Sequence, residues 1–317
     1  MKILVVYDLP REGFKALTDA GHELFFPKET LFSGEELLDR LTDADVVVSV
    51  FTQPFTAEHI DAAAHLKLIA NYGVGFNTID VEYATKHGIT VTNTPDPVIE
   101  PTAELAMTLM LALSRKITEL DRKIRIENGL KWGIMENLGD SLQNKTLGII
   151  GMGNIGQSLA RRALANGMNI IYYNRHKLDP LIEKQYHAKY VDQNTLLTDA
   201  DYISLNAPYT RETHHILNKA AFEKMKPTVY IVNTARGPLI DEVALAEALK
   251  TGRIAGAGLD VFENEPDIHA DLLNLENVIM VPHVGTGTID TRIEIGKCVS
   301  KNILNFLNGK GEIDKVN

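Results

Sequence analysis

This chain has very little of three things: cysteine, long apolar runs and surplus positive charge. Its single cysteine, Cys298, excludes an internal disulfide, a CxxC redox motif and a cysteine-based zinc site. No apolar run approaches the roughly 20 residues of a membrane-spanning helix. The first eight residues reach an acid, Asp8, too early for a secretory signal. We therefore expect a cytoplasmic protein without a membrane partner.

The net charge of the chain further limits the classes of binding partner that we expect. There are 42 acidic and 32 basic side chains, so the formal net charge is −10. This balance disfavours non-specific binding to nucleic acid, although a local basic pocket for a phosphorylated small molecule stays open. Hydrophobic residues make up 44% of the chain, which is enough to build packed cores. Because single cores rarely grow beyond about 250–300 residues, 317 residues favour two domains.

The first hundred residues alternate between short β-branched runs and helical patterns, which predicts a parallel sheet built from βαβ units. Strands are expected at residues 3–7, 22–26, 46–50, 67–70 and 89–92. Helical patterns lie near residues 11–20, 35–41, 57–63 and 78–86. Together they predict one self-sufficient α/β domain.

The pattern changes at residues 93–97, which are too rich in proline to continue a helix or a strand. One long helix is expected over residues 103–126, with Pro101 where a helix can begin. A second α/β series follows, with strands expected at residues 147–150, 169–173, 202–206, 229–233, 255–260 and 278–281. A last helix is expected near residues 289–307.

A glycine-rich turn follows the first strand of the second series. The pattern G-x-G-x-x-G begins at Gly151, in the strand–turn–helix setting that it requires. Gly151 permits the tight turn, Gly153 lets a pyrophosphate approach the backbone, and Gly156 brings the helix close to the strand. The helix N-terminus around Asn154 and Ile155 offers free N–H groups to phosphates. This segment predicts a dinucleotide-binding site.

The end of the next strand bears on the choice of dinucleotide. An NAD site usually has an acid about 20 residues after the glycines, where it binds the ribose hydroxyls. This chain has Asn174, Arg175 and His176 there instead. An acid would repel a 2′-phosphate, whereas an arginine can bind it bidentately. We therefore expect NADP(H) to be preferred, with NAD(H) open as an alternative; a plain solvated loop would also account for these residues.

Three further segments lie at the ends of expected strands: residues 232–237, 258–266 and 281–285. In this order behind GMGNIG they resemble the D-isomer-specific 2-hydroxyacid dehydrogenases. The resemblance covers essentially the whole chain, including residues 73–80, and within the family it points to the glyoxylate, hydroxypyruvate and 2-ketogluconate reductase branch. It implies an α/β protein with a Rossmann-type dinucleotide-binding domain at 99–286. A flavodoxin-like substrate domain would comprise 1–98 and 287–317, with the active site in the interdomain cleft.

The resemblance also implies a catalytic triad of Arg236, Glu265 and His283. A guanidinium fork can hold the oxygens of a 2-oxo acid, and an imidazolium can protonate the alkoxide left by hydride addition. A carboxylate beside the imidazole favours its protonated form and fixes its orientation. Arg236 and His283 would then bind substrate together with the backbone N–H groups of Val74 and Gly75. Taken singly, each residue also has a structural explanation. Arg236 could form an ion pair, Glu265 could cap a helix or turn, and His283 could be a buried, hydrogen-bonded histidine.

Other cofactor contacts are implied only by the resemblance. They are Thr102, Ala207, Pro208, Thr213, Thr234, Ala235, Asp260 and Gly285. Asp260 would meet the nicotinamide carboxamide, and Thr102 would face the nicotinamide. One departure is Gly-Thr-Gly-Thr at 285–288, where relatives often carry Gly-Ser-Ala-Thr, and it affects only the fine shape of the pocket. No metal is expected, because the histidines, His214 and His215 included, have no metal-ligand spacing with carboxylates.

The function expected from these features is NADPH-dependent reduction of a 2-oxo acid to the D-2-hydroxy acid. Relatives that oxidise phosphoglycerate carry an arginine in the loop after the third strand, but residues 49–55 and 71–77 contain no basic residue here. An unphosphorylated substrate such as glyoxylate or hydroxypyruvate therefore fits better. Two alternatives stay open: an NAD enzyme like D-3-phosphoglycerate dehydrogenase, and a binding protein like the nicotinamide-sensing corepressors.

The family further implies a homodimer formed through the nucleotide domains. The only tryptophan, Trp132, lies in a charged segment of that domain and could form part of the contact. A plain surface or internal packing role explains Trp132 equally well.

Overall fold

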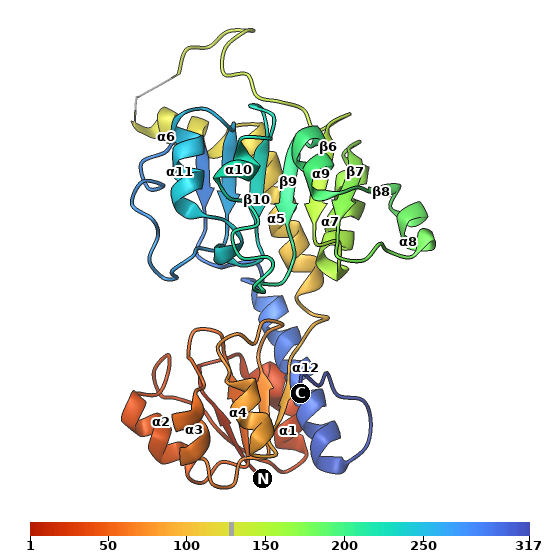
Figure 1. Ribbon diagram of the computed structural model, residues 1–317. Coiled ribbons are helices and arrows are strands. Elements are labelled where there is room, and N and C mark those ends of the chain that lie inside the picture. The colour runs from red at the N-terminus through yellow and green to blue at the C-terminus, as the bar shows by residue number, and fades with distance from the viewer. Residues whose placement is uncertain (127–129) are drawn as a thin grey trace. The chain divides into compact units, whose positions relative to one another are not determined.

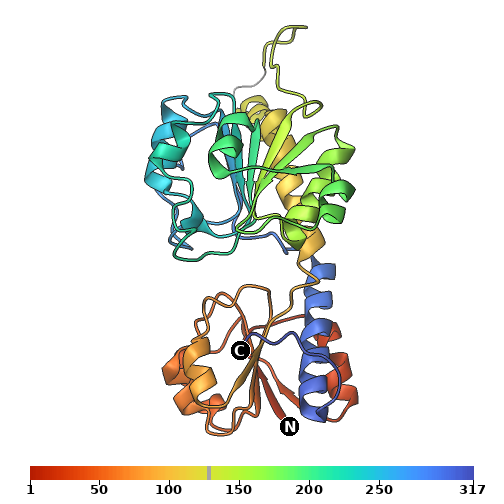
Figure 2. The same ribbon diagram turned by 45° about the vertical axis from the view of Figure 1, so that its right-hand side comes forward.

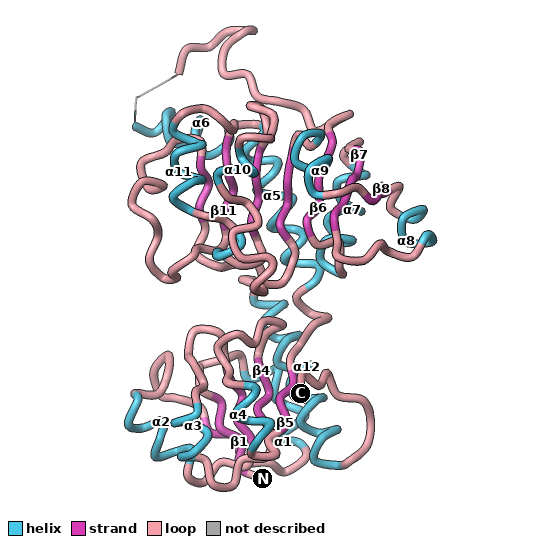
Figure 3. Tube along the Cα trace, viewed as in Figure 1, coloured by secondary structure: helices cyan, strands magenta, loops and turns pink. Residues whose placement is uncertain are grey.

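The structure is a computed structural model that describes residues 1–126 and 130–317. These residues form two compact units, one made of Met1–Val98 with Thr286–Asn317 and the other of Ile99–Gly285. Over the described ranges, the first unit contains a five-stranded sheet and the second a seven-stranded sheet. Among the described residues, every pairing between the strands of the two sheets is parallel, and Figure 3 shows the strands in magenta. The α/β class expected from the sequence is confirmed.

The sheet of the first unit has the strand order β2-β1-β3-β4-β5, which is the flavodoxin-like order. Its strands are β1 (Lys2–Val5), β2 (Glu23–Phe25), β3 (Val46–Ser49), β4 (Leu68–Asn71) and β5 (Thr90–Thr92). Its helices are the 3₁₀ turn η1 (Arg11–Phe14), α1 (Lys15–Asp19), α2 (Gly34–Leu41), α3 (Ala57–Ala62), α4 (Val81–Lys86) and α12 (Ile289–Asn308). In Figure 2, α1 and α12 lie on one side of this sheet and α2, α3 and α4 on the other.

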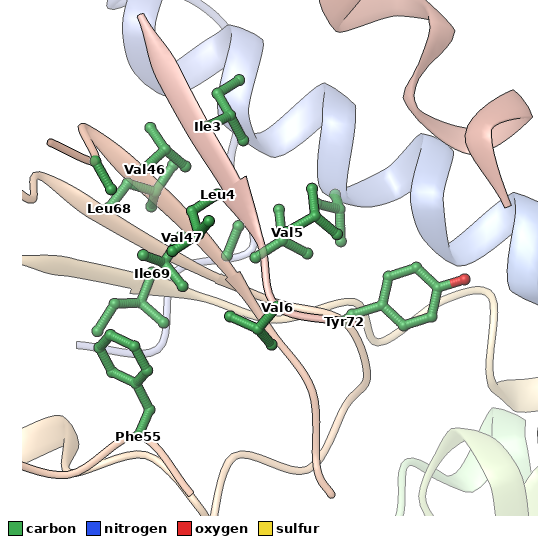
Figure 4. Close-up of a cluster of buried hydrophobic side chains, with 14 of the residues drawn as sticks. Ile3, Leu4, Val5, Val6, Val46, Val47, Phe55, Leu68, Ile69 and Tyr72 are labelled. Atoms are coloured by element: carbon green, nitrogen blue, oxygen red, sulfur yellow. The ribbon is translucent and has the colours of Figure 1, made fainter. Parts of the chain in front are cut away.

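Helices on both faces explain why the strands of this unit are continuously apolar rather than alternating. Ile3, Val5 and Val47 are completely buried, and Figure 4 shows them within one cluster at the centre of the sheet. Tyr72 belongs to the same cluster, at its edge in Figure 4, and its hydroxyl donates a hydrogen bond to the carbonyl of Arg292. Burial raises the pKa of Tyr72 well above its usual range, so the hydroxyl stays a donor.

The last helix belongs to the first unit although it follows the second in sequence. Its buried residues Ile295, Val299 and Ile303 join the core around β1 and β4. The helix ends where Gly309 takes a left-handed conformation with φ of 62°, which is the usual helix-terminating role of glycine. The last helix expected near residues 289–307 is therefore confirmed.

The seven-stranded sheet of the second unit has the order β12-β11-β10-β9-β6-β7-β8, a doubly wound Rossmann-type order with one further strand. Its strands are β6 (Thr146–Ile150), β7 (Asn169–Tyr173), β8 (Ala188–Tyr190), β9 (Tyr202–Leu205), β10 (Tyr230–Asn233), β11 (Gly256–Leu259) and β12 (Val278–Met280). Its helices are α5 (Ile99–Ser114), α6 (Ile117–Ile126), α7 (Asn154–Ala165), α8 (Pro180–Gln185), α9 (Gln193–Asp199), α10 (Lys219–Phe222), the 3₁₀ turn η2 (Gly237–Leu239) and α11 (Glu242–Lys250). Two separate apolar clusters cover its faces, with α9, α10 and α11 on one and α5 and α7 on the other (Figure 1).

The expectation of one long helix over residues 103–126 is wrong. The chain instead forms α5 and α6, and the break falls at Lys116, which has φ of 53°. The apolar part, α5, packs against the sheet, whereas α6 buries none of its described side chains. Strand β8 was not expected either, because its three residues carry no β-branched pattern. No helix within 1–126 or 130–317 has the length and apolar character needed to cross a membrane.

Candidate active site

Three neighbouring strands of the second unit bring the expected triad to one edge of its sheet. Arg236 follows the end of β10 by three residues, Glu265 lies in the loop after β11, and His283 lies in the loop after β12. Strands β10, β11 and β12 are adjacent and parallel, so their carboxyl ends meet at the same edge. This edge is where open α/β sheets bind their ligands.

Glu265 and His283 form a hydrogen-bonded pair. The Nδ1 atom of His283 lies 2.8 Å from Oε2 of Glu265, and the other oxygen, Oε1, accepts a hydrogen bond from the N–H of Phe262 at 3.0 Å. Burial alone would raise the pKa of Glu265. The hydrogen bond and charge of His283, the Phe262 N–H and the charge of Arg236 outweigh it, and the pKa falls below its usual range. An ionised carboxylate only accepts, so Nδ1 of His283 donates to it.

Asp260 holds the turn that carries His283. His283 has φ of 53°, and its N–H donates to the carbonyl of Asp260 at 2.8 Å. The two carboxylate oxygens of Asp260 accept from the N–H groups of Val284 at 2.6 Å and Gly285 at 2.9 Å. Burial raises the pKa of Asp260 despite these donors. A Cβ on Gly285 would lie 3.0 Å from Oδ2 of Asp260 and 3.5 Å from Cγ2 of Thr102, so Gly285 packs beside both side chains.

Arg236 is held by a tight turn that sequence reasoning did not find. The buried amide of Asn233 accepts from the N–H of Ala235 at 3.0 Å and donates to the carbonyl of Arg236 at 2.9 Å. An asparagine at the end of a strand is a common turn former, and that signal could have identified Asn233. Burial lowers the pKa of the Arg236 guanidinium and the nearby Glu265 opposes this, yet an arginine stays charged at any physiological pH.

The loops of Arg236 and Glu265 contact each other through their backbones. A Cβ on Gly237 would overlap the carbonyl carbon and the oxygen of Phe262, so only a glycine fits there. This close approach holds the backbones of the two loops against each other.

The glycine-rich turn lies between β6 and α7 with the geometry of a phosphate cradle. Gly151 has φ of 92°, and a Cβ there would overlap the backbone nitrogen of Ala207. Gly153 is exposed, and a Cβ there would meet nothing within 4 Å. Helix α7 begins at Asn154 with no side chain capping it, so the N–H groups of its first turn remain available to an anion.

Two buried polar atoms at the same edge bear on whether a dinucleotide fits. Oδ1 of Asn206 and Oγ1 of Thr234 have no hydrogen-bond partner among the residues that the structure describes. Buried polar atoms in proteins nearly always have a hydrogen-bond partner, and a bound polar ligand would provide one for each of these two atoms. Nearby, Oγ1 of Thr213 donates to the carbonyl of Pro208 at 2.8 Å and closes the loop after β9. The residues at this edge therefore fit a dinucleotide.

The segment after β7 lies against the glycine-rich turn. Oδ1 of Asn174 accepts from the N–H of Met152 at 2.7 Å, while Arg175 and His176 are exposed. The pKa of Glu212 falls below its usual range, chiefly through a hydrogen bond with Thr210, and the charge of Arg175 contributes. Arg175 therefore lies close enough to the loop after β9 to act on its charges.

Val74 and Gly75 belong to the first unit, in the loop after β4. Within the described ranges, neither backbone N–H donates a hydrogen bond, so both are available to a bound anion. Among those same residues, no group of three or more His, Cys, Asp or Glu side chains is placed to hold a metal ion.

Comparison with known proteins identifies the family. The family model described as "D-isomer specific 2-hydroxyacid dehydrogenase, NAD binding domain" matches residues 107–285. The chain belongs to the D-isomer-specific 2-hydroxyacid dehydrogenase family. This dehydrogenase is 42% identical over 317 residues to the glyoxylate reductase of Thermococcus litoralis, covering 98% of this chain and 95% of the relative.

Solved structures agree along the whole length of the dehydrogenase. A protein from Thermus thermophilus superposes with a TM-score of 0.93 at 37% identity, with all of both chains covered. A glyoxylate reductase from Paecilomyes thermophila superposes with a TM-score of 0.88 at 37% identity, covering 100% of this chain and 98% of the other. The family and the branch expected from the sequence are confirmed.

The dehydrogenase contains a second histidine–glutamate pair that the sequence did not reveal. Nε2 of His215 lies 2.6 Å from Oε1 of Glu263, and the N–H of Glu263 donates to Glu242 at 2.7 Å. The pair joins the loop after β9 to the loop that carries Glu265. His215 and Glu263 are 48 residues apart in sequence, and no local pattern connects them.

Proposed function

We propose that this dehydrogenase reduces a small unphosphorylated 2-oxo acid, such as glyoxylate or hydroxypyruvate, to the D-2-hydroxy acid with NADPH as the preferred reductant. The observation that carries the proposal is the 2.8 Å hydrogen bond between His283 and Glu265, with Arg236 close enough to lower the pKa of Glu265. The full-length similarity to proteins named glyoxylate reductase supports the substrate class.

The proposed reaction divides the work among four groups of this chain. Arg236 and the N–H groups of Val74 and Gly75 bind the substrate carboxylate, and the guanidinium also polarises the carbonyl. When bound, the reduced nicotinamide supplies the hydride that adds to the carbonyl carbon. His283 donates the proton on Nε2 to the oxygen as its negative charge develops. Glu265 favours the imidazolium before transfer and keeps its ring oriented, and solvent returns the proton afterwards.

The cofactor contacts follow the carboxyl edge of the seven-stranded sheet. The turn at Gly151 and Gly153 and the first turn of α7 would hold the pyrophosphate, while Asn174, Arg175 and His176 would meet the 2′-phosphate. The remaining contacts proposed are Thr102, Asn154, Ile155, Gly156, Ala207, Pro208, Thr213, Thr234, Ala235, Asp260 and Gly285. The preference for NADPH rests on the absence of an acid at Asn174-Arg175, together with the exposed guanidinium of Arg175.

The substrate is proposed to be unphosphorylated because no counter-charge is present in the loops that would face its tail. The loop between β3 and α3 and the loop between β4 and α4 carry no lysine or arginine at 49–55 and 71–77. A phosphate group on the substrate would therefore lose its water without gaining an ion pair. A small or apolar tail meets no such penalty.

We also propose that two copies of the chain associate through an exposed apolar surface on the second unit. The arm surface comprises Ile117, Ile124, Ile126, Trp132, Ile134, Met135 and Leu138. Trp132 is 90% exposed and Ile134 is 94% exposed, which rules out an internal packing role for Trp132 in this chain. Residues 130–138, which contain no helix or strand, extend away from the sheet (Figure 1). Large exposed apolar side chains that lie close together in the sequence are typical of an interface, and aromatic anchors dominate such contacts.

One assay tests the reaction. Loss of nicotinamide absorbance is followed with NADPH and with NADH, using glyoxylate, hydroxypyruvate and phosphohydroxypyruvate as substrates. We expect the highest kcat/KM with NADPH and an unphosphorylated substrate, and a D-configured product from hydroxypyruvate. Turnover confined to the phosphorylated substrate would favour a phosphoglycerate dehydrogenase-like enzyme. Tight NADPH binding with no turnover would favour a nicotinamide-sensing binding protein.

A further inference from the structure

The loop that presents Val74 and Gly75 has its carbonyls held by two side-chain amides. Nδ2 of Asn71 donates to the carbonyl of Gly73 at 2.9 Å and to that of Gly75 at 2.8 Å. Nδ2 of Asn93 donates to the carbonyl of Val74 at 2.9 Å. Three successive carbonyls are therefore bound by the ends of β4 and β5.

The amide of Asn71 has only one orientation open to it. Asn71 and Ser49 are each 1% exposed, and Oγ of Ser49 donates to Oδ1 of Asn71 at 3.2 Å. Since the oxygen is bound to Ser49, the NH₂ group faces the loop and both of its hydrogens are used. A buried, fully bonded amide of this kind is a rigid support.

Asn93 is fixed through its backbone. Its N–H donates to the carbonyl of Asp314 at 3.0 Å, and its carbonyl accepts from Nδ2 of Asn302 at 2.9 Å. Asn302 lies on α12, is 1% exposed, and also accepts from the N–H of Asp314 at 3.1 Å. The support under Val74 therefore reaches into the core of the first unit.

This arrangement leaves the opposite groups of the same loop unused. In the described parts of the chain, no hydrogen bond begins at the N–H of Val74 or Gly75, and both residues are partly exposed. A loop with its carbonyls tied inward and its N–H groups free presents a concentration of positive partial charge, which suits an anion. The same loop with free carbonyls would present negative partial charge instead.

We propose that Asn71 and Asn93 are positioning residues that set the affinity of this loop for the substrate carboxylate. They touch no substrate; they act by keeping the carbonyls of Gly73, Val74 and Gly75 turned away from it. The inference rests on the proposed function for the identity of the ligand, a carboxylate of a 2-oxo acid.

The test is Asn71→Asp in the full-length protein. Aspartate has the same shape but cannot donate, so both carbonyl contacts are lost and a negative charge is added beneath the loop. We expect KM for glyoxylate and the dissociation constant for oxalate, a non-reducible carboxylate, each to rise at least about tenfold. We expect kcat to change by less than about threefold and NADPH affinity to be unchanged, because the proposed cofactor contacts lie in the other unit.

The matched control is Asn305→Asp. Asn305 lies on α12 and its amide also donates to a backbone carbonyl, that of Glu312, at 2.7 Å, but it does not contact the loop. This variant undergoes the same chemical change in the same unit and should bind oxalate like wild type. Asn93→Asp, which breaks one carbonyl contact instead of two, should raise the oxalate dissociation constant by a smaller factor. If Asn71→Asp fails to fold, Asn93→Asp and Ser49→Ala carry the comparison.

The outcomes separate this inference from the proposed reaction. Oxalate affinity in folded Asn71→Asp and Asn93→Asp equal to that of Asn305→Asp overturns the inference, even if glyoxylate is reduced. Failure of wild type to bind oxalate also overturns it. If wild type binds oxalate and Asn71→Asp does not, but no 2-oxo acid is reduced, the positioning role stands and the proposed reaction fails.

Discussion

The side-chain oxygen of Asn174 accepts a hydrogen bond from the backbone N–H of Met152 at 2.7 Å. This contact ties the end of β7 to the glycine-rich turn, at the place where an NAD enzyme would have an acid. Because the Asn174 oxygen is committed to the turn, the proposed recognition of the 2′-phosphate depends mainly on the exposed Arg175 and His176 that follow it.

Cofactor preference should therefore respond to changes at two adjacent residues. Arg175→Ala should raise KM for NADPH at least about tenfold and leave KM for NADH nearly unchanged, because only NADPH carries the 2′-phosphate. Asn174→Asp should shift preference toward NADH, since aspartate keeps an acceptor for Met152 and repels the phosphate. Lys177→Ala is the control, because Lys177 is exposed and paired with Glu183. A wild-type enzyme with the higher kcat/KM for NADH would contradict this assignment.

Arg236 should be required for substrate but not for cofactor. Arg236→Ala should remove most of kcat/KM for glyoxylate while NADPH affinity, measured by fluorescence titration, stays close to wild type. Arg236→Lys should recover little, because an ammonium is a point charge and cannot reproduce the planar fork. If the alanine variant keeps near-normal kcat/KM, Arg236 has no part in the reaction.

Substitutions at Gly153 and Gly237 should have opposite effects on NADPH affinity and on the unfolding temperature: the first should lower mainly the affinity, and the second mainly the unfolding temperature. Gly153→Ala adds a methyl group where nothing lies within 4 Å, so the unfolding temperature should change little while NADPH affinity falls, because the pyrophosphate needs that space. Gly237→Ala would drive its Cβ into the backbone of Phe262, so it should lower the unfolding temperature markedly. Thermal unfolding and NADPH titration of both variants check this. Unimpaired NADPH binding by Gly153→Ala would exclude the turn as the phosphate site.

The arm surface should mediate self-association. Trp132→Glu should raise the dimer dissociation constant at least about tenfold, because it puts a charge at the aromatic anchor of an apolar contact. Leu181→Glu is the matched control, since Leu181 is 75% exposed on α8 and lies outside the arm surface. Sedimentation over a range of concentrations measures both. Equal association of Trp132→Glu and wild type would remove the arm surface from the interface.

The structural features that could be predicted from the sequence are those determined by residues adjacent in the chain. The strand–turn–helix at Gly151 is contiguous in sequence, and each glycine in it has its own geometric requirement. Likewise, Asn308-Gly309 marks a helix end because glycine takes the left-handed conformation without strain. The resemblance then supplied the proposed roles of Arg236, Glu265 and His283, and the strand order brings these residues to one edge of the sheet.

The structural features that could not be predicted depend on contacts between residues far apart in the sequence. The break at Lys116 occurs because α5 has a sheet to pack against and α6 has none, which no periodicity in residues 103–126 encodes. The amides of Asn71, Asn93 and Asn233 look like ordinary turn residues, and only the folded chain shows which carbonyls they bind. Hydrogen bonds from these side-chain amides to backbone carbonyls can form only after the strands of the sheet have paired.

The ionisation of Glu265 determines the pH range in which His283, the proposed proton donor, can be tested. Its pKa is depressed in the folded protein, so the carboxylate stabilises the fold at pH values above the unfolded pKa of about 4.3, and this contribution is lost as the pH falls through the folded value. Above about pH 5 the carboxylate is therefore ionised. A change in rate above that pH therefore does not come from protonation of Glu265.

The most direct test of the account is the pH dependence of kcat/KM in both directions for wild type and Glu265→Gln. Reduction needs an imidazolium at His283, so it should fall as the pH rises, while oxidation of the D-2-hydroxy acid should increase over the same interval. Glutamine keeps the shape but removes the charge that favours the imidazolium, so reduction by this variant should fall at a lower pH than in wild type. His283→Ala should lose roughly 10²–10⁴-fold in rate at every pH. A Glu265→Gln enzyme with the wild-type pH profile in both directions would contradict the role of the His283–Glu265 pair.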